Sequence, residues 1–143
     1  MTNSSLVSYS LDILLVDDNP INLQLLGKAL LSIFTVRRLD LAYDGYQALR
    51  LLEHRHYNVL LLDIDMPGID GIETTQYIRR QPSSSIAHVL DANRSIPIVA
   101  VTTNDSVEAR HLYQKVGIDA CLGKPIIISQ LKSQLLGLLD LSP

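Results

Sequence analysis

Side chains that could do chemistry stand directly after four of the short apolar runs in this sequence of 143 residues. They are Asp17, Asp18, Asp63, Thr102 and Lys124. Open α/β sheets hold their ligands and reactive groups beyond the carboxyl ends of their strands. If the four runs are neighbouring parallel strands, all of these side chains meet at one edge of the sheet. We therefore expect a single site there.

The three carboxylates of this set predict a bound cation. When Asp17, Asp18 and Asp63 lie close together, each raises the pKa of the others unless a positive charge joins them. A few carboxylate oxygens suit Mg²⁺, which keeps water ligands and favours phosphate-bearing substrates. Lys124 offers a point charge to a phosphoryl oxygen, and Thr102 offers a hydroxyl donor. A nucleophilic carboxylate, a metal and two donors are the parts that phosphoryl transfer needs.

The elements that must position this site are predicted from apolar periodicity. Val59-Leu60-Leu61-Leu62 is typical of a strand buried on both faces, and Met66-Pro67-Gly68 after it indicates a loop. Strands are expected at about 11–16, 36–42, 58–62, 96–101 and 118–122. Helices are expected at about 20–33, 45–55, 71–80, 105–116 and 127–139. This alternation predicts an α/β domain with a doubly wound parallel sheet and helices on both faces.

The buried faces of the helices follow from the same periodicity. The residues expected to face inward in the first helix are Ile21, Leu25, Ala29 and Ile33, with Leu26 and Leu30 beside them. Those of the fourth helix are Val107, Leu112 and Val116, and those of the last are Ile128, Leu131, Leu135 and Leu138. Asn19 is expected to cap the first helix, with Pro20 at its first position. The predicted domain spans 11–140, after a flexible tail at 1–10, and 81–95 is expected to be a mobile surface loop with room for a turn of helix.

Composition limits the class of protein. The formal net charge of -3 gives no basic field, so we expect no nucleic-acid binding by this domain. Cys121 is the only cysteine, which excludes an internal disulfide and a thiolate zinc site, and we expect it to be a small buried residue. No run of 18 apolar residues and no signal-peptide pattern is present, so we expect no membrane association and a cytoplasmic, or in a eukaryote nuclear, location.

Four motifs together resemble those of the receiver domain of two-component response regulators. They are Leu-Leu-Val-Asp-Asp-Asn, Leu-Leu-Leu-Asp-Ile-Asp-Met-Pro-Gly-Ile-Asp-Gly, Val-Ala-Val-Thr-Thr and Gly-Lys-Pro. The resemblance covers about residues 10–140 and implies a (βα)5, flavodoxin-like fold with strand order 2-1-3-4-5. The Asp-Asp-Asn-Pro-Ile-Asn opening is most similar to receivers of hybrid kinases and of eukaryotic phosphorelays.

The resemblance also implies roles for single residues. Asp63 is expected to be the phosphoacceptor. Asp18 is expected to bind Mg²⁺ directly, Asp17 mainly through water, and Asp65 through its backbone carbonyl. The implied donor is a phosphohistidine, either on a histidine phosphotransfer protein or on a histidine kinase, while the downstream effector stays unnamed. Such a domain is a signalling receiver and no ordinary enzyme, because it catalyses only its own phosphorylation and slow dephosphorylation.

Thr102 and Lys124 are expected to contact the phosphoryl group, but one neighbouring position departs from the family. A Tyr or Phe that couples to the threonine usually lies three residues before the lysine, where this chain has Cys121. We therefore hypothesise that the phosphorylated state is read out through Thr102 and the adjacent loop, or that the domain passes its phosphoryl group onward.

Two other functions are compatible with parts of the sequence. A haloacid-dehalogenase-like phosphatase begins with an apolar strand and Asp-x-Asp, which Leu-Leu-Leu-Asp-Ile-Asp fits. Those enzymes do not continue with Met66-Pro67, and their acidic pair follows the lysine, whereas Asp17 and Asp18 precede it. The second alternative is a pseudo-receiver that docks partners without phosphate; Cys121 favours it, and the complete set of acidic, hydroxyl and amine side chains disfavours it.

Overall fold

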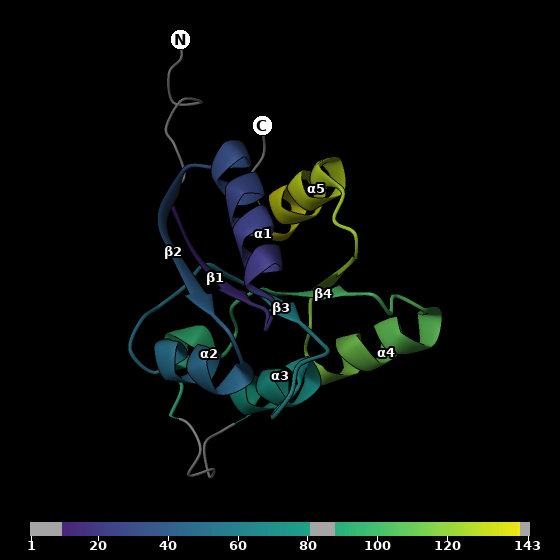
Figure 1. The fold of residues 1–143 in the computed structure, drawn as a ribbon. Coiled ribbons are helices and arrows are strands. Elements are labelled where there is room, and N and C mark those ends of the chain that lie inside the picture. Colours follow the sequence, from purple (N-terminus) through teal and green to yellow (C-terminus); the bar gives the residue numbers. More distant parts are fainter. Residues whose placement is uncertain (1–9, 81–87, 141–143) are drawn as a thin grey trace.

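The computed structural model describes residues 10–80 and 88–140, and Figure 1 shows their arrangement. The predicted tail, apart from Ser10, and the first half of the predicted 81–95 loop lie outside the described residues. In the rest of that loop a short 3-10 helix, Asp91–Asn93, forms the predicted turn of helix.

A single parallel sheet positions the site. Its strands are β1 (Leu11–Val16), β2 (Val36–Ala42), β3 (Val59–Asp63), β4 (Ile98–Thr102) and β5 (Ala120–Gly123). They pair in the order β2-β1-β3-β4-β5, and every pairing is parallel. The predicted fold class and strand order are confirmed. The third, fourth and fifth strands end one residue later than predicted, so that Asp63 and Thr102 are themselves the last residues of their strands.

Helices cover both faces of this sheet (Figure 1). They are α1 (Pro20–Ile33), α2 (Gly45–Leu52), α3 (Gly71–Arg79), α4 (Val107–Val116) and α5 (Ile128–Leu138). α1 and α5 lie on one face, and α2, α3 and α4 lie on the other. Alternate strand residues enter two separate apolar cores: Leu15 and Leu61 pack with the α1–α5 layer, while Leu14 and Leu60 pack with the α2–α4 layer. Burial on both sides explains the continuous apolar runs of the strands.

The helices begin where the sequence provides caps. The side chain of Asn19 accepts hydrogen bonds from the amides of Ile21 and Asn22, and Pro20 is the first helical residue of α1. Both predictions for this terminus are confirmed. Asp70 and Glu73 form a capping box at the start of α3. Such caps satisfy amides that have no partner within the helix.

The predicted inward face of α1 is wrong only in its first turns, since Leu26, Ala29, Leu30 and Ile33 all pack in the core of the α1–α5 layer. Ile21 and Leu25 are 65% and 63% exposed, whereas Leu23, Gly27 and Leu30 are buried. The inward face contains a glycine, which gives no apolar signal. A Cβ at Gly27 would lie 3.3 Å from Leu39 Cδ2, so the missing side chain lets α1 approach β2 closely.

The predicted faces of α4 and α5 need similar corrections. In α4, Val107 is 66% exposed and Leu112 is also exposed, while Ala109 and Tyr113 face inward. Val116 packs against the core as predicted. The rest of the inward face is a small residue and an amphipathic aromatic, which the apolar periodicity does not indicate. In α5, Leu131 and Leu135 are buried as predicted, but Ile128 is exposed.

A glycine at the start of α3, Gly71, lies against the backbone of the loop that follows β3. Replacing it by alanine tests how close this approach is. A Cβ at Gly71 would lie 2.7 Å from both the carbonyl oxygen of Asp63 and the Cα of Ile64. Because both neighbours are backbone atoms, the loop must shift. We expect Gly71→Ala to lower the free energy of unfolding by about 2 kcal/mol, measured by chemical denaturation. Gly137→Ala is the matched control.

Gly137 lies in α5, where an added Cβ would meet no atom of the described residues within 4 Å. Alanine should raise the free energy of unfolding there by about 0.5 kcal/mol, because alanine favours helix more than glycine does. Equal effects of the two substitutions would contradict the backbone contact inferred at Gly71.

Candidate functional site

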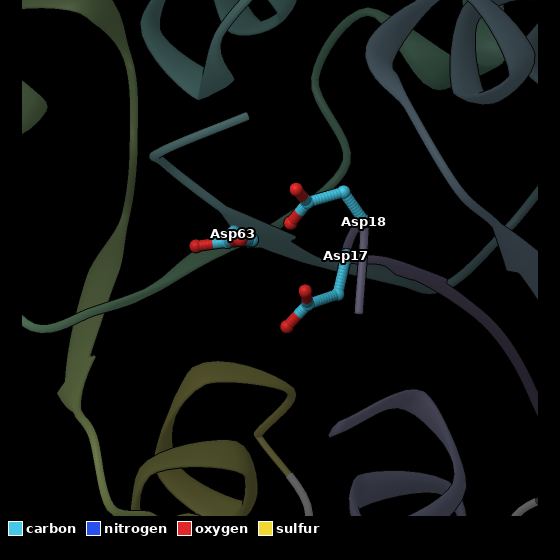
Figure 2. Close-up of side chains that lie close together, drawn as sticks. All are labelled: Asp17, Asp18 and Asp63. Atoms are coloured by element: carbon cyan, nitrogen blue, oxygen red, sulfur yellow. The ribbon is translucent and has the colours of Figure 1, made fainter. Parts of the chain in front are cut away.

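The structure brings the predicted site residues to the carboxyl edge of the sheet. Asp17 and Asp18 directly follow β1, Asp63 ends β3, and Lys124 directly follows β5. Figure 2 shows the three aspartate side chains grouped at the ends of their strands. Thr102 ends β4 on the same edge, next to β3, where Asp63 is paired with Val101.

The aspartates form a cluster suited to a divalent cation. One carboxylate oxygen from each of Asp17, Asp18 and Asp63 lies within 4.8 Å of the other two. Asp17 and Asp63 are buried and Asp18 is exposed, so the cluster is open to solvent on one side. Together with Lys124 these groups leave an excess of two negative charges, which one divalent cation would balance. All-oxygen ligation with room for water fits Mg²⁺.

Lys124 is held between two of these carboxylates. Its Nζ donates to Asp63 Oδ1 at 3.2 Å and to Asp17 Oδ2 at 3.4 Å. The ammonium group therefore lies beside a carboxylate oxygen of Asp63 and is also oriented by Asp17. Its side chain is about one-fifth exposed, so it is close to solvent and to an incoming anion.

Burial raises the pKa of Asp63 to about 6, and the charge of Asp17 acts in the same direction. The charge and the hydrogen bond of Lys124 oppose this rise, as does a hydrogen bond with the Asp65 backbone. For Lys124, burial lowers the pKa, but the charges of Asp63 and Asp17 outweigh burial and the net pKa is raised. Lys124 therefore stays protonated. Its single positive charge does not offset burial and the charge of Asp17, so the pKa of Asp63 remains raised.

A small polar cavity opens above these groups. It has a volume of about 290 Å³, and its lining includes Asp17, Asp18, Asp63, Asp65 and Lys124. Asn19, Asn22 and Thr103 also line it. Sequence reasoning placed Asp65 correctly beside the site. It did not single out Asn22 and Thr103, although both end motifs that the sequence analysis quotes, Asp-Asp-Asn-Pro-Ile-Asn and Val-Ala-Val-Thr-Thr.

Thr102 differs from the other predicted residues because its hydroxyl is engaged away from the cavity. The side chain is 1% exposed, and its Oγ1 accepts a hydrogen bond from the Asn104 amide at 3.0 Å. Oγ1 also lies 3.4 Å from the hydroxyl of Tyr113 on α4. Tyr113 was missed from the sequence, and the available signal was that it is the only aromatic residue of the predicted fourth helix.

An apolar hollow adjoins the site on the α1–α5 side of the sheet. It measures about 350 Å³ and is lined by Leu25, Leu26, Ala29, Ile126 and Ile128, with Asp17 and Lys124 at its polar end. Ile21 and Ile127 are exposed close by in the sequence. The unexpected exposure of Ile21, Leu25 and Ile128 therefore gives this side of the site an apolar surface.

Two further sequence predictions concern the burial of the single cysteine and the presence of membrane-spanning helices. Cys121 is buried, as predicted. Within residues 10–80 and 88–140, no helix is both long enough and apolar enough to cross a bilayer.

Comparison with known families defines the class of protein to which this fold and site belong. Residues 13–136 match the response regulator receiver domain family. The chain belongs to that family, and it is a receiver domain of two-component or phosphorelay signalling systems. This membership rules out the haloacid-dehalogenase-like alternative.

Known relatives and solved structures agree with this assignment. The stress response regulator protein 1 of Lodderomyces elongisporus is 34% identical over 113 residues, which are 79% of this chain and 29% of that protein. The sensor protein EvgS of Escherichia coli K12 is 36% identical over 125 residues, which are 87% of this chain and 9% of that protein. The chain thus spans under a third of the length of either relative.

A receiver crystal structure gives a further match. The receiver domain of the sensor histidine kinase PA1611 from Pseudomonas aeruginosa is 31% identical and has a TM-score of 0.77. The match covers 92% of this chain and 99% of that one, and that structure holds a magnesium ion coordinated in its active-site cleft.

Proposed function

We propose that residues 11–140 act as a phosphorelay receiver in which Asp63 accepts a phosphoryl group from a phosphohistidine. One observation carries the proposal: Asp63 lies at the edge of the sheet with Lys124 Nζ 3.2 Å from its Oδ1. A carboxylate nucleophile and a cation are thus already adjacent where an incoming phosphoryl group would meet them. Family membership supports the same role.

In the proposed transfer, an oxygen of Asp63 attacks phosphorus as the bond from phosphorus to the imidazole nitrogen breaks. The bonding electrons stay on the imidazole, and Asp63 becomes an acyl phosphate. Lys124 turns toward a phosphoryl oxygen and stabilises its charge, while Thr102 donates its hydroxyl hydrogen to another. Slow attack of water on the phosphorus of the acyl phosphate releases inorganic phosphate and restores the carboxylate of Asp63.

Mg²⁺ is the proposed cofactor, because the donor set fits it. The carboxylates of Asp18 and Asp63 would hold it directly, Asp17 mainly through water, and Asp65 through its backbone carbonyl. When bound, Mg²⁺ supplies positive charge to the oxygens of the transferring group. The magnesium ion in the cleft of the PA1611 receiver supports this assignment.

The proposed donor is a histidine phosphotransfer protein or a histidine kinase that docks over α1. The apolar hollow between α1 and α5 ends in polar groups of the site, so a helix seated there would bring its histidine toward Asp63. Exposed Ile21 and Leu25 supply an apolar contact surface. The output is proposed to be a conformational change or transfer of the phosphoryl group onward, and no nucleic-acid or membrane contact is proposed.

The proposal predicts one labile, Mg²⁺-dependent phosphoryl group. We expect intact-mass spectrometry after incubation with acetyl phosphate to show a single phosphoryl adduct, and chelation of Mg²⁺ to prevent it. A receiver of known activity labelled in parallel controls for the phosphodonor. If that control is labelled and this chain is not, the domain is a phosphate-independent docking module instead.

A further inference from the structure

The aromatic side chain of Tyr113 joins helix α4 to the predicted phosphoryl site. It is 4% exposed and lies in the core between the sheet and the α2–α4 layer. Its hydroxyl donates to the carbonyl of Asn104 at 2.8 Å and lies 3.4 Å from Thr102 Oγ1. A single hydroxyl thus contacts both the end of β4 and the segment that leads into α4.

Hydrogen counting determines the direction of these bonds. The Tyr113 hydroxyl has one hydrogen, which the Asn104 carbonyl receives because a carbonyl can only accept. The Thr102 hydroxyl must therefore supply the hydrogen in its contact with Tyr113. Thr102 has only this one hydrogen, while its oxygen accepts from the Asn104 amide at 3.0 Å. The three groups form a closed set in which every hydrogen is already used.

The proposed function requires the same Thr102 hydrogen for a phosphoryl oxygen on Asp63. Asp63 is paired with Val101, the neighbour of Thr102, so the two sites are adjacent on the sheet edge. The hydroxyl cannot serve both acceptors fully. At 3.4 Å the contact with Tyr113 is long, so it can be given up at a modest cost.

We propose that Tyr113 is a positioning residue that competes with the phosphoryl group for the hydroxyl hydrogen of Thr102, so that phosphorylation of Asp63 breaks the contact between Thr102 and Tyr113 of α4. This inference rests on the proposed function. The inference explains how a change at Thr102 would reach the surface of the domain, because the aromatic residue in contact with Thr102 belongs to α4. On β5 the corresponding core position is occupied by the small, buried Cys121.

A double-mutant cycle on the full chain tests the competition. The probe is beryllofluoride with Mg²⁺, which binds a carboxylate oxygen in the tetrahedral shape of a phosphoryl group. We expect Tyr113→Phe to tighten beryllofluoride binding by about 2- to 10-fold, the range that corresponds to the net free energy of one hydrogen bond. In a Thr102→Val background the same substitution should change nothing, because no hydroxyl hydrogen remains to compete for.

A merely structural role of Tyr113 predicts the same effect in both backgrounds, and that result would overturn the inference. Tyr77→Phe is the matched control, because Tyr77 on α3 packs against the same core. It should leave binding unchanged. Unaltered binding by Tyr113→Phe in a protein that does bind beryllofluoride would also overturn the inference while leaving the proposed function intact.

The wild-type protein offers a second measurement that needs no variant. We expect the ring resonances of Tyr113 and the amide resonances of α4 to shift when beryllofluoride binds, while the ring resonances of Tyr77 stay in place. Binding with no shift at Tyr113 would refute the inference alone. If the wild-type chain binds no beryllofluoride, the proposed function and this inference fall together.

Discussion

Asp63→Asn should take up no phosphoryl group from acetyl phosphate under conditions in which the wild-type chain takes up one. The amide of asparagine has no anionic oxygen to attack phosphorus. Of the two carboxylates that accept a hydrogen bond from Lys124, Asp63 has the shorter one, at 3.2 Å against 3.4 Å for Asp17. Intact-mass spectrometry measures the result. Wild-type incorporation in this variant would refute the assignment of Asp63.

The matched control is Asp65→Asn, which keeps the backbone carbonyl proposed for Mg²⁺ and removes a neighbouring charge. We expect it to retain labelling. Loss of labelling in both variants would instead indicate that uptake of the phosphoryl group depends on the total negative charge of the cavity and does not identify Asp63 as the nucleophile.

The folded state of Asp63→Asn can be verified by a gain in stability. The pKa of Asp63 in the folded protein is about 6, above the ordinary 3.8, so folding favours its neutral form. Ionisation of this buried group therefore opposes folding as the pH rises above the ordinary pKa. Without Mg²⁺ at pH 7, the neutral amide should raise the free energy of unfolding by about 1 kcal/mol. A large loss of stability would mean that the missing phosphoryl group reflects unfolding.

Lys124→Ala should slow phosphorylation by about 100-fold, because removal of one preorganised group that stabilises transition-state charge has an effect of that size. The rate of adduct formation with acetyl phosphate measures it. Lys132→Ala is the matched control, since Lys132 is an exposed lysine on α5. It should leave the rate unchanged.

Without Mg²⁺, Lys124→Ala should also lower the free energy of unfolding by about 1–2 kcal/mol. The substitution removes hydrogen bonds to Asp17 and Asp63 and leaves two buried carboxylates without their cation. Mg²⁺ should recover part of this loss, because it neutralises the same charges. A rate equal to that of wild type would show that Lys124 has no role in the transfer.

Much of this fold follows from the sequence because short apolar runs bounded by turn residues indicate the buried strands β1, β3 and β4. The alternation of these runs with helices then places the residues after each strand on one edge. That rule alone brings Asp17, Asp18, Asp63 and Lys124 together. The start of α1 could also be predicted from the sequence, since Asn19 and Pro20 form a recognisable helix cap.

The orientation of the helices was less predictable, for reasons that particular residues explain. Gly27 faces inward on α1, and a residue without a side chain adds nothing to an apolar pattern. Tyr113 faces inward on α4 because its hydroxyl finds partners there: the Asn104 carbonyl accepts its hydrogen and Thr102 Oγ1 lies 3.4 Å away. These partners come from outside the helix. Periodicity records the polarity of residues, but it does not record such partners.

The two separate cores have a consequence for how this domain can change its partners. Leu15 and Leu61 belong to the α1–α5 layer, and Leu14 and Leu60 belong to the α2–α4 layer, so each strand serves both layers with alternate residues. The proposed donor surface lies in the first layer and Tyr113 lies in the second. We therefore expect substitutions on the exposed face of α1 to alter binding of the proposed donor while the packing around α4 stays the same. The proposed donor surface and Tyr113 thus lie on opposite faces of the sheet and meet only at its carboxyl edge, where Asp63 and Thr102 lie. We therefore expect that the outer residues of one layer can be exchanged without redesign of the other.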